Sequence, residues 1–336
     1  TSQCGQTVGE AIIIDTSKHL NNLISLDVKK QIAWVEPGLV LDKLNAILKP
    51  YGLWFPVDVS TGNRATIGGM AGNNSCGSRS IHYGTMRDNV QSIEVVLADG
   101  RKMTFGAIAT NQDLGSLNED EVVLIETLLQ IGKREKTTIN DRFPDLMRRV
   151  GGYNIDALLP DGVPISAWNK STLFEPARYP NLAHLLVGSE GTLGFSSRIE
   201  LKLKPIPNQK VLGVCHFPSF YKAMASTKKI VELEPSAVEL VDNTMIQLAR
   251  AVPLFKKTVD AFVKGDPDAL LLVEFSDKGK KEQLEKLENL KVELDGIADS
   301  DSNVVCEFAS INERRGMKLL VGGKLSIENL TFKGAG

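Results

Sequence analysis

The chain has 336 residues, of which 42% are hydrophobic, and its formal net charge is −2. This length and composition predict a soluble, folded protein of roughly two domains. Its basic residues are dispersed and no apolar run approaches the roughly 18 residues of a membrane span, so we expect a small-molecule-binding protein in the cytoplasm, with neither nucleic acid nor a membrane as partner.

The first hundred residues alternate between apolar runs and turn residues. Residues 12–15 predict a buried strand, residues 21–27 a turn, and residues 31–35 a second strand that leads to a Pro-Gly turn. Apolar residues at helical spacing from Leu41 to Leu48 predict a helix, which Pro50 and Gly52 end. Residues 92–97 alternate as a further strand.

A polar loop rich in glycine, asparagine and serine lies between that helix and the strand at 92–97. Gly68 and Gly69 have no Cβ, so the backbone can approach a ligand closely there. Short polar side chains add hydrogen-bonding groups, and exposed backbone N–H groups suit a pyrophosphate. The loop therefore predicts a site for a large phosphorylated ligand.

The middle of the chain changes pattern twice. Between about residues 104 and 134 the apolar spacing is helical, with acidic residues in the first turn. Residues 136–180 form a long connection rich in proline and polar residues, and a loop of that length is either functional or disordered. A strand at 197–204 then ends in the proline-punctuated linker 204–208, where we place a domain boundary.

The remainder of the chain predicts a smaller α+β domain. Residues 211–217, 237–240 and 269–275 are strand-like, and residues 221–233 are helical. Residues 278–294 predict a helix that buries one leucine stripe beneath a charged face.

The motifs resemble one known family. Between residues 35 and 100 the sequence carries V-x-P-G, G-L-x-x-P, A-T-I-G-G-M, Y-G-T-x-R-D-x-V and V-x-L-A-D-G, and residues 188–194 read G-S-E-G-T-L-G. This order resembles the FAD-binding domain of the vanillyl-alcohol oxidase type. Together with P-S-A-V-E-L-V-D at 235–242, it is similar to the FAD-linked D-2-hydroxy-acid dehydrogenases of the D-lactate, glycolate and D-2-hydroxyglutarate kind.

The resemblance implies an α+β fold in two parts. A vanillyl-alcohol oxidase type (PCMH-like) FAD-binding domain is expected at residues 1–205, and a smaller ferredoxin-like α+β cap domain at residues 206–336. Residues 1–6 resemble the second half of the family's pyrophosphate loop, and residues 313–320 resemble imperfectly an arginine-bearing helix. We therefore expect a fragment that lacks N- and C-terminal parts of the family pattern.

The implied activity is FAD-dependent oxidation of a D-2-hydroxy acid to the 2-oxo acid, by hydride transfer to flavin N5. Arg314 and Arg315 are the candidates to bind the substrate carboxylate, and the catalytic base is not identified, because the family's histidine-rich, metal-binding segment has no counterpart here. The expected cofactor contacts are Thr1, Ser2, Pro56, Ser60, Thr66, Ile67, Gly68, Gly69, Asn74, Ser75, Tyr83, Gly84, Glu190, Gly191, Gly194 and Phe195.

Residues 148–156, R-R-V-G-G-Y-N-I-D, resemble long family members that carry an iron–sulfur region, so an iron–sulfur electron-acceptor domain or subunit is a possible partner. Arg148 and Arg149 are either ligands of a substrate carboxylate or, the interpretation we favour, surface arginines. The chain is alternatively a non-catalytic FAD-binding module whose partner polypeptide supplies base, metal and electron exit. No G-x-G-x-x-G of a nicotinamide dehydrogenase occurs, and the cap signature argues against other flavoproteins of this fold.

The cysteines and histidines predict no metal site and no iron–sulfur cluster within the chain. Four cysteines are too widely spaced for a C-x-x-C motif and too few for a disulfide scaffold. Four histidines form no H-x-x-H pattern. His82, beside the polar loop, is a candidate for a hydrogen bond to the cofactor, although packing is favoured, while His184 and His216 lie in apolar strand-like runs typical of core histidines.

Overall fold

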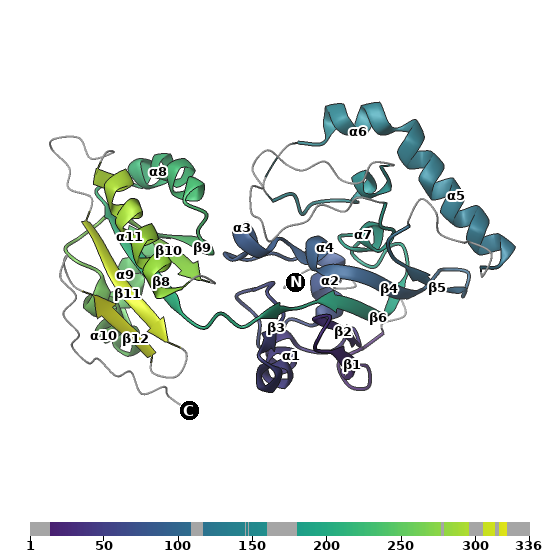
Figure 1. Cartoon of the computed structure of the whole chain (residues 1–336), viewed down its shortest axis with the longest axis horizontal. Helices are drawn as coiled ribbons and strands as arrows, with labels where there is room; N and C mark the ends of the chain where they lie inside the picture. Colours follow the sequence, from purple (N-terminus) through teal and green to yellow (C-terminus); the bar gives the residue numbers. More distant parts are fainter. Residues whose placement is uncertain are drawn as a thin grey trace. The chain divides into compact units, whose positions relative to one another are not determined.

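The computed structural model describes residues 14–108, 117–144, 146, 148–159, 180–276, 279–295, 305–312 and 316–320. The chain divides into two units, one ending at Ile206 and the other beginning at Pro207. Figure 1 shows the elements of each unit.

The first unit is built on a five-stranded antiparallel sheet (Figure 1). Its strand order is β1-β2-β6-β4-β5, and the bounds are Leu23–Asp27, Ile32–Val35, Phe195–Lys202, Val90–Val96 and Lys102–Phe105. A separate pair joins β3 (Leu53–Trp54) to β7 (Lys204–Pro205). The central strand β6 thus pairs with two strands, β4 and β2, that come much earlier in the sequence.

Alternation in sequence sets the register of the central strands. Ile93 of β4 faces Ile199 of β6, and both side chains are fully buried. Because side chains alternate between the faces of a strand, one face of the sheet is apolar and packs into the core. Helix α1 (Leu41–Leu48) covers part of that core with Leu44 and Leu48, as its apolar spacing predicted.

Three sequence predictions in this unit were wrong. Residues 23–27 form a strand rather than a turn, because pairing with β2 outweighs the turn residues that flank it, and Ile14 and Asp15 are not in a strand. The polar loop is largely helical. It contains the short helices α2 (Ile67–Asn73), α3 (Ser80–Tyr83) and α4 (Met86–Asn89), which are fixed by caps and tertiary contacts rather than by apolar spacing.

The helical prediction for residues 104–134 was wrong at its start. Thr104 belongs to β5, and helix α5 runs over Glu119–Arg134. Asn118 and Glu121 form a reciprocal capping box that fixes this start. The connection that follows contains helix α6 (Lys136–Arg142), the 3-10 turn η3 (Ile155–Leu158) and helix α7 (Ala183–Leu186).

The second unit has a ferredoxin-like arrangement within a five-stranded antiparallel sheet, in the order β12-β11-β8-β10-β9. In chain order the elements are β8 (Lys210–Phe217), α8 (Phe220–Glu232), β9 (Ala237–Asp242), α9 (Asn243–Ala251), α10 (Pro253–Phe262), β10 (Ala269–Ser276), α11 (Lys280–Asp295), β11 (Val305–Asn312) and β12 (Gly316–Leu320). Helices α8 and α11 pack on one face of the sheet, and α9 and α10 pack on the other.

The sequence missed several elements of this unit. Helices α9 and α10 were not predicted, and residues 316–320 form strand β12 where an arginine-bearing helix was expected, paired in register with β11. Asp242 begins α9 by accepting a hydrogen bond from the Met245 amide. Among the described helices of both units, none is long and apolar enough to cross a membrane.

Helix α5 touches η3 at a glycine, and this contact gives a stability test. A Cβ at Gly132 would lie 2.0 Å from the carbonyl oxygen of Leu158. Alanine normally stabilises a helix interior by about 1 kcal/mol over glycine, yet we expect Gly132→Ala to lower the free energy of unfolding by about 1–3 kcal/mol because of this clash. Urea denaturation measures the difference.

Glu126→Ala, on the exposed side of the same helix, serves as the control and should change the free energy of unfolding by less than about 0.5 kcal/mol. A Gly132→Ala protein more stable than the parent would contradict the packing described for α5 and η3.

Candidate functional site

Helix α2 is the centre of the predicted ligand loop. The Thr66 hydroxyl caps the helix by accepting the Gly69 amide at 3.3 Å, and Ile67, Met70 and Ala71 turn into the core. The Gly68 amide donates to the Pro37 carbonyl at 2.7 Å, and a Cβ at Gly68 would lie 2.6 Å from that of Pro37. Gly68 is therefore required by contact with the chain itself.

The other glycines of α2 are different. Among the described residues, a Cβ at Gly69 would meet only the Thr66 hydroxyl, at 3.1 Å, and one at Gly72 would have no neighbour closer than 3.8 Å. The packing of this described part of the chain does not demand glycine at either position. An open glycine surface of this kind fits close approach by a flat ligand.

The backbone N–H groups at the start of α2 are already engaged. Ile67 donates to the Leu39 carbonyl, Gly68 to Pro37, and Gly69 to the Thr66 side chain. The sequence argument that amides here await a pyrophosphate is therefore wrong for residues 67–69. What this face offers a ligand is close contact rather than free donors.

The second glycine-rich block lies against the end of α2. The amides of Gly188 and Glu190 donate to the carbonyls of Ala71 and Gly72, each at 2.9 Å, and Asn73 Nδ2 donates to the Glu190 carboxylate at 3.0 Å. The structure thus brings together two blocks that are far apart in the sequence, since Asn73 and Glu190 are separated by 117 positions.

The 190–192 turn presents an exposed glycine beside α2. Gly191 has a φ of 76°, a conformation that favours glycine, and a Cβ there would meet no atom of the described residues within 4 Å. Gly194 differs, since its Cβ would lie 2.6 Å from the Val95 side chain, so packing against β4 explains it. Together, Gly69, Gly72 and Gly191 form what we call the open glycine surface.

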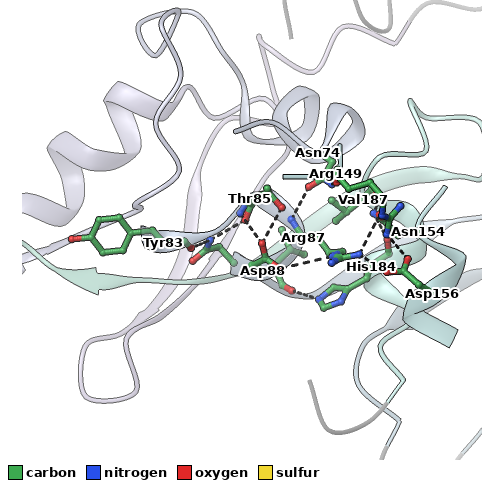
Figure 2. A network of polar contacts seen from close by, with 12 residues as sticks. Asn74, Tyr83, Thr85, Arg87, Asp88, Arg149, Asn154, Asp156, His184 and Val187 are labelled. Carbon is green, nitrogen blue, oxygen red and sulfur yellow. Dashed lines mark hydrogen bonds and ion pairs between the residues drawn. The ribbon is translucent and has the colours of Figure 1, made fainter. Parts of the chain in front are cut away.

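Asn74 serves the fold rather than the open surface. It ends α2 with a φ of 52° and is 1% exposed. Its Oδ1 accepts the Arg87 amide at 3.0 Å, and its Nδ2 donates to the Arg149 carbonyl at 3.4 Å (Figure 2). Ser75 likewise makes internal contacts, to Asn73 and to the Met86 amide.

Tyr83 and Gly84 are also held by internal packing. The buried Tyr83 ring makes edge contacts with Trp54 and His82, so His82 packs on an aromatic ring. Gly84 has a φ of 79°, and a Cβ there would lie 2.7 Å from the Asp88 side chain. Asp88 in turn forms a capping box with Thr85 that fixes the start of α4 (Figure 2).

The remaining expected contacts are scattered. Pro56 is buried, Ser60 is exposed, and Phe195 pairs with Val96 at the start of β6. Thr1, Ser2, Arg314 and Arg315 lie outside the described residues.

A buried ionic contact that sequence reasoning missed lies behind these blocks. Asp156 accepts Arg87 Nη1 at 2.9 Å on one oxygen and Arg149 Nη2 at 2.6 Å on the other (Figure 2). The three side chains are 8–16% exposed. We call this trio the Asp156 latch. Its sequence signal was a carboxylate within the apolar run 155–159, where a charge needs a partner.

Asn154 and His184 surround the latch. Asn154 Nδ2 donates to the carbonyls of His184 and Val187 at 3.2 and 2.8 Å. His184 lies in helix α7, not in the predicted strand, and its Nε2 is 3.1 Å from the Val90 carbonyl, which requires the hydrogen on Nε2. His184 Nδ1 is buried without a hydrogen-bond partner. His216 fits the core prediction, since its Nε2 contacts Lys264 and Phe262 main chain.

Burial and the nearby Arg87 guanidinium lower the pKa of His184 from 6.5 to about 4. The imidazole is therefore neutral at pH 7 in the folded chain. Arg149, named as a substrate candidate, is committed to Asp156, and Arg148 donates to the Gly77 carbonyl at 3.0 Å. Arg148 is thus an exposed arginine, as the favoured interpretation has it, whereas Arg149 is mostly buried, and both contact the cofactor blocks.

The comparisons with known proteins agree with this geometry. Residues 1–106 match the family described as "FAD binding domain", and residues 206–317 match "FAD linked oxidases, C-terminal domain". D-2-hydroxyglutarate dehydrogenase of Escherichia coli is 30% identical over 95% of this chain and 30% of its own length, and that of Haemophilus influenzae is 30% identical over 84% of this chain and 27% of its own.

A probable mitochondrial D-lactate dehydrogenase of Danio rerio is 32% identical over 63% of this chain and 30% of its own length. The chain thus spans about 30% of the length of these relatives. A solved alkyldihydroxyacetonephosphate synthase, 17% identical, superposes with a TM-score of 0.53 over 85% of this chain and 42% of its own, which supports the fold.

The His184 pKa predicts a pH dependence. Between pH 6.5 and about 4 the unfolded chain binds a proton at this side chain and the folded chain does not, so stability falls as the pH falls. The contribution is at most about 3 kcal/mol. His184→Gln keeps a donor for Val90 but does not titrate, so its unfolding free energy should vary less over this window.

Denaturant titrations at pH 7 and pH 4.5 compare the parent with this variant and with His19→Gln, an exposed control. Equal pH dependence in all three proteins would contradict a buried, neutral His184.

Proposed function

Because this chain belongs to the FAD-linked oxidase family, we propose that it forms the flavin-bearing part of an enzyme that oxidises a D-2-hydroxy acid to the 2-oxo acid. FAD is the cofactor that both matched families name. The observation that carries the proposal is the contact of α2 with the 188–191 turn, which assembles the open glycine surface.

The described residues fit a flavin. Gly69, Gly72 and Gly191 leave space that the chain's own side chains do not use. Gly68, Gly84 and Gly194 are explained by close contacts within the chain and Gly191 by its positive φ, so Gly69 and Gly72 are the two glycines of these blocks that neither reason accounts for among the described residues. When bound, FAD supplies the acceptor for the hydride that leaves the substrate Cα.

The chain's own contribution is orientation. Thr66 fixes the start of α2, and Glu190 is tied to both the main chain and the Asn73 side chain of that helix. Because these groups are already hydrogen-bonded, the surface is set before a ligand arrives, and binding costs little reordering. The substrates named for the relatives, D-2-hydroxyglutarate and D-lactate, give the substrate class, an α-hydroxy carboxylate.

A second candidate function is a cofactor-binding module that works with another polypeptide. The positions of His82, His184 and His216 favour it, since the first packs on Tyr83 and the other two are buried against main chain. These contacts do not place any of the three histidines as a base beside the open glycine surface.

Anaerobic reduction separates the two candidates. The purified chain is loaded with FAD, freed of excess cofactor, and mixed with D-2-hydroxyglutarate, D-lactate or, as a control, L-lactate, while visible absorption is recorded. The enzyme proposal predicts bleaching with a D-acid and none with the L-isomer. Bound flavin that dithionite bleaches and no D-acid bleaches would support the module instead.

The open glycine surface predicts a second result. Gly69→Leu places a side chain where, within the part of the chain that the structure describes, only the Thr66 hydroxyl is near, so the fold should persist while FAD retention is lost. Gel filtration followed by visible absorption measures retention, and thermal unfolding of the apo-protein reports the fold. Ala46→Leu, on the exposed side of α1, is the matched control and should retain FAD. Undiminished retention by Gly69→Leu would remove α2 from the site.

A further inference from the structure

Residues 148–156 lie in the stretch between the two family matches, which cover 1–106 and 206–317. They nevertheless contact both cofactor blocks. Arg148 donates to the Gly77 carbonyl at 3.0 Å, and the Arg149 carbonyl accepts from Asn74 at 3.4 Å, so the first half of the segment is attached to the α2 block.

The second half of the segment is attached to the other block. Asn154 donates to the Val187 carbonyl at 2.8 Å, and a Cβ at Gly188 would lie 3.2 Å from the Gly152 carbonyl oxygen. The Tyr153 hydroxyl is 2.8 Å from Thr192 Oγ1. The segment therefore contacts both of the blocks that carry the open glycine surface.

The direction of the Tyr153 hydrogen bond follows from Thr192. The single hydroxyl hydrogen of Thr192 is donated to the Ser189 carbonyl at 2.6 Å. Tyr153 must then be the donor to Thr192, whose oxygen accepts. This hydrogen bond attaches Tyr153 to the 190–192 turn through Thr192, and the neighbouring Gly191 in that turn is exposed.

The Asp156 latch explains how an exposed tyrosine keeps its place. Tyr153 is 47% exposed, and among the described residues a Cβ added at Gly151 or Gly152 would meet no atom within 4 Å, so few side chains surround this stretch. Arg149 and Asp156, on either side of this stretch, are joined at 2.6 Å, and Asp156 is also joined to Arg87 of α4. Separating a buried pair leaves an uncompensated charge, so the loop ends are firmly held.

We propose that residues 148–156 form a third wall of the FAD site, in which Tyr153 positions the 190–192 turn and the Arg149–Asp156 pair holds Tyr153 in place. This inference rests on the proposed FAD binding. Tyr153, Arg149 and Asp156 are positioning residues in this account, since they act on the cofactor through Thr192 and Gly191.

The test measures FAD affinity by quenching of flavin fluorescence, together with thermal unfolding of the apo-protein and visible circular dichroism of the bound flavin. Tyr153→Phe and Thr192→Val each remove the hydroxyl contact at an exposed position. We expect each to raise the Kd for FAD about fivefold, the fold-change that corresponds to one hydrogen bond of about 1 kcal/mol, with an altered dichroism spectrum and an unchanged Tm.

The double variant should bind no more weakly than Thr192→Val alone, since both lack the Tyr153–Thr192 contact, whereas Thr192→Val also removes the hydrogen bond to the Ser189 carbonyl that Tyr153→Phe keeps. Tyr51→Phe is the matched control, because Tyr51 is 55% exposed and ends the 3-10 turn η1 (Lys49–Tyr51) that follows α1, away from the 190–192 turn in the sequence. Arg149→Met should weaken FAD binding at least as much as Tyr153→Phe, and Arg149→Lys should recover part of the loss.

Three results overturn the inference. They are an unchanged Kd in Tyr153→Phe and Thr192→Val, additive effects in the double variant, and a lowered Tm with unchanged FAD affinity. Failure of the parent chain to bind FAD would be a different result, because it would refute the proposed function itself.

Discussion

A single buried carboxylate joins three parts of the first unit. Asp156 lies between Arg87, at the end of the polar loop, and Arg149, at the start of the segment that crosses to the second glycine block. Both guanidinium groups are charged at neutral pH and mostly withdrawn from water, so each depends on the shared partner. Asn74 and Asn154 add hydrogen bonds to the same frame, from α2 on one side and from residues 184 and 187 on the other.

This frame gives the glycines of the site two distinct roles. Gly68, Gly84 and Gly194 are required because a side chain would strike the chain itself. Gly69 and Gly72 are free of that demand and lie on the exposed or half-buried side of α2. The motif A-T-I-G-G-M therefore combines Gly68, which is needed for close packing against Pro37, with Gly69, which leaves room for a cofactor. The sequence alone does not distinguish these two roles, whereas the structure does.

Much of the fold was predictable because its signals are local. The helix at Leu41–Leu48 and the strands at Lys210–Phe217 and Ala269–Ser276 follow from apolar spacing over a single element. Helix α2 was not, because it is only seven residues long and is made by the Thr66 cap and by contacts with Pro37 and Gly188. The latch was not predictable either, since Arg87 and Asp156 are 69 residues apart and their pairing needs the assembled sheet.

The family resemblance correctly gave the cofactor and the fold of both units, but it placed Asn74, Ser75 and Tyr83 in the site by motif alone. In the structure these side chains are buried and bonded internally, and they support the frame. Conversely, the resemblance included Asp156 in its motif but gave it no role, although its carboxylate joins Arg87 to Arg149.

Native-state hydrogen exchange of the parent chain tests most directly whether this frame is one unit. The amides of Met86, Arg87, Gly188 and Glu190 are each hydrogen-bonded within it, to Ser75, Asn74, Ala71 and Gly72. A frame joined through Asp156 predicts that these four amides open with one common free energy, shared with Ile93 and Val95 of β4. Rapid exchange of Gly188 and Glu190 while Arg87 and β4 stay protected would contradict the account, because the two glycine blocks would then open independently.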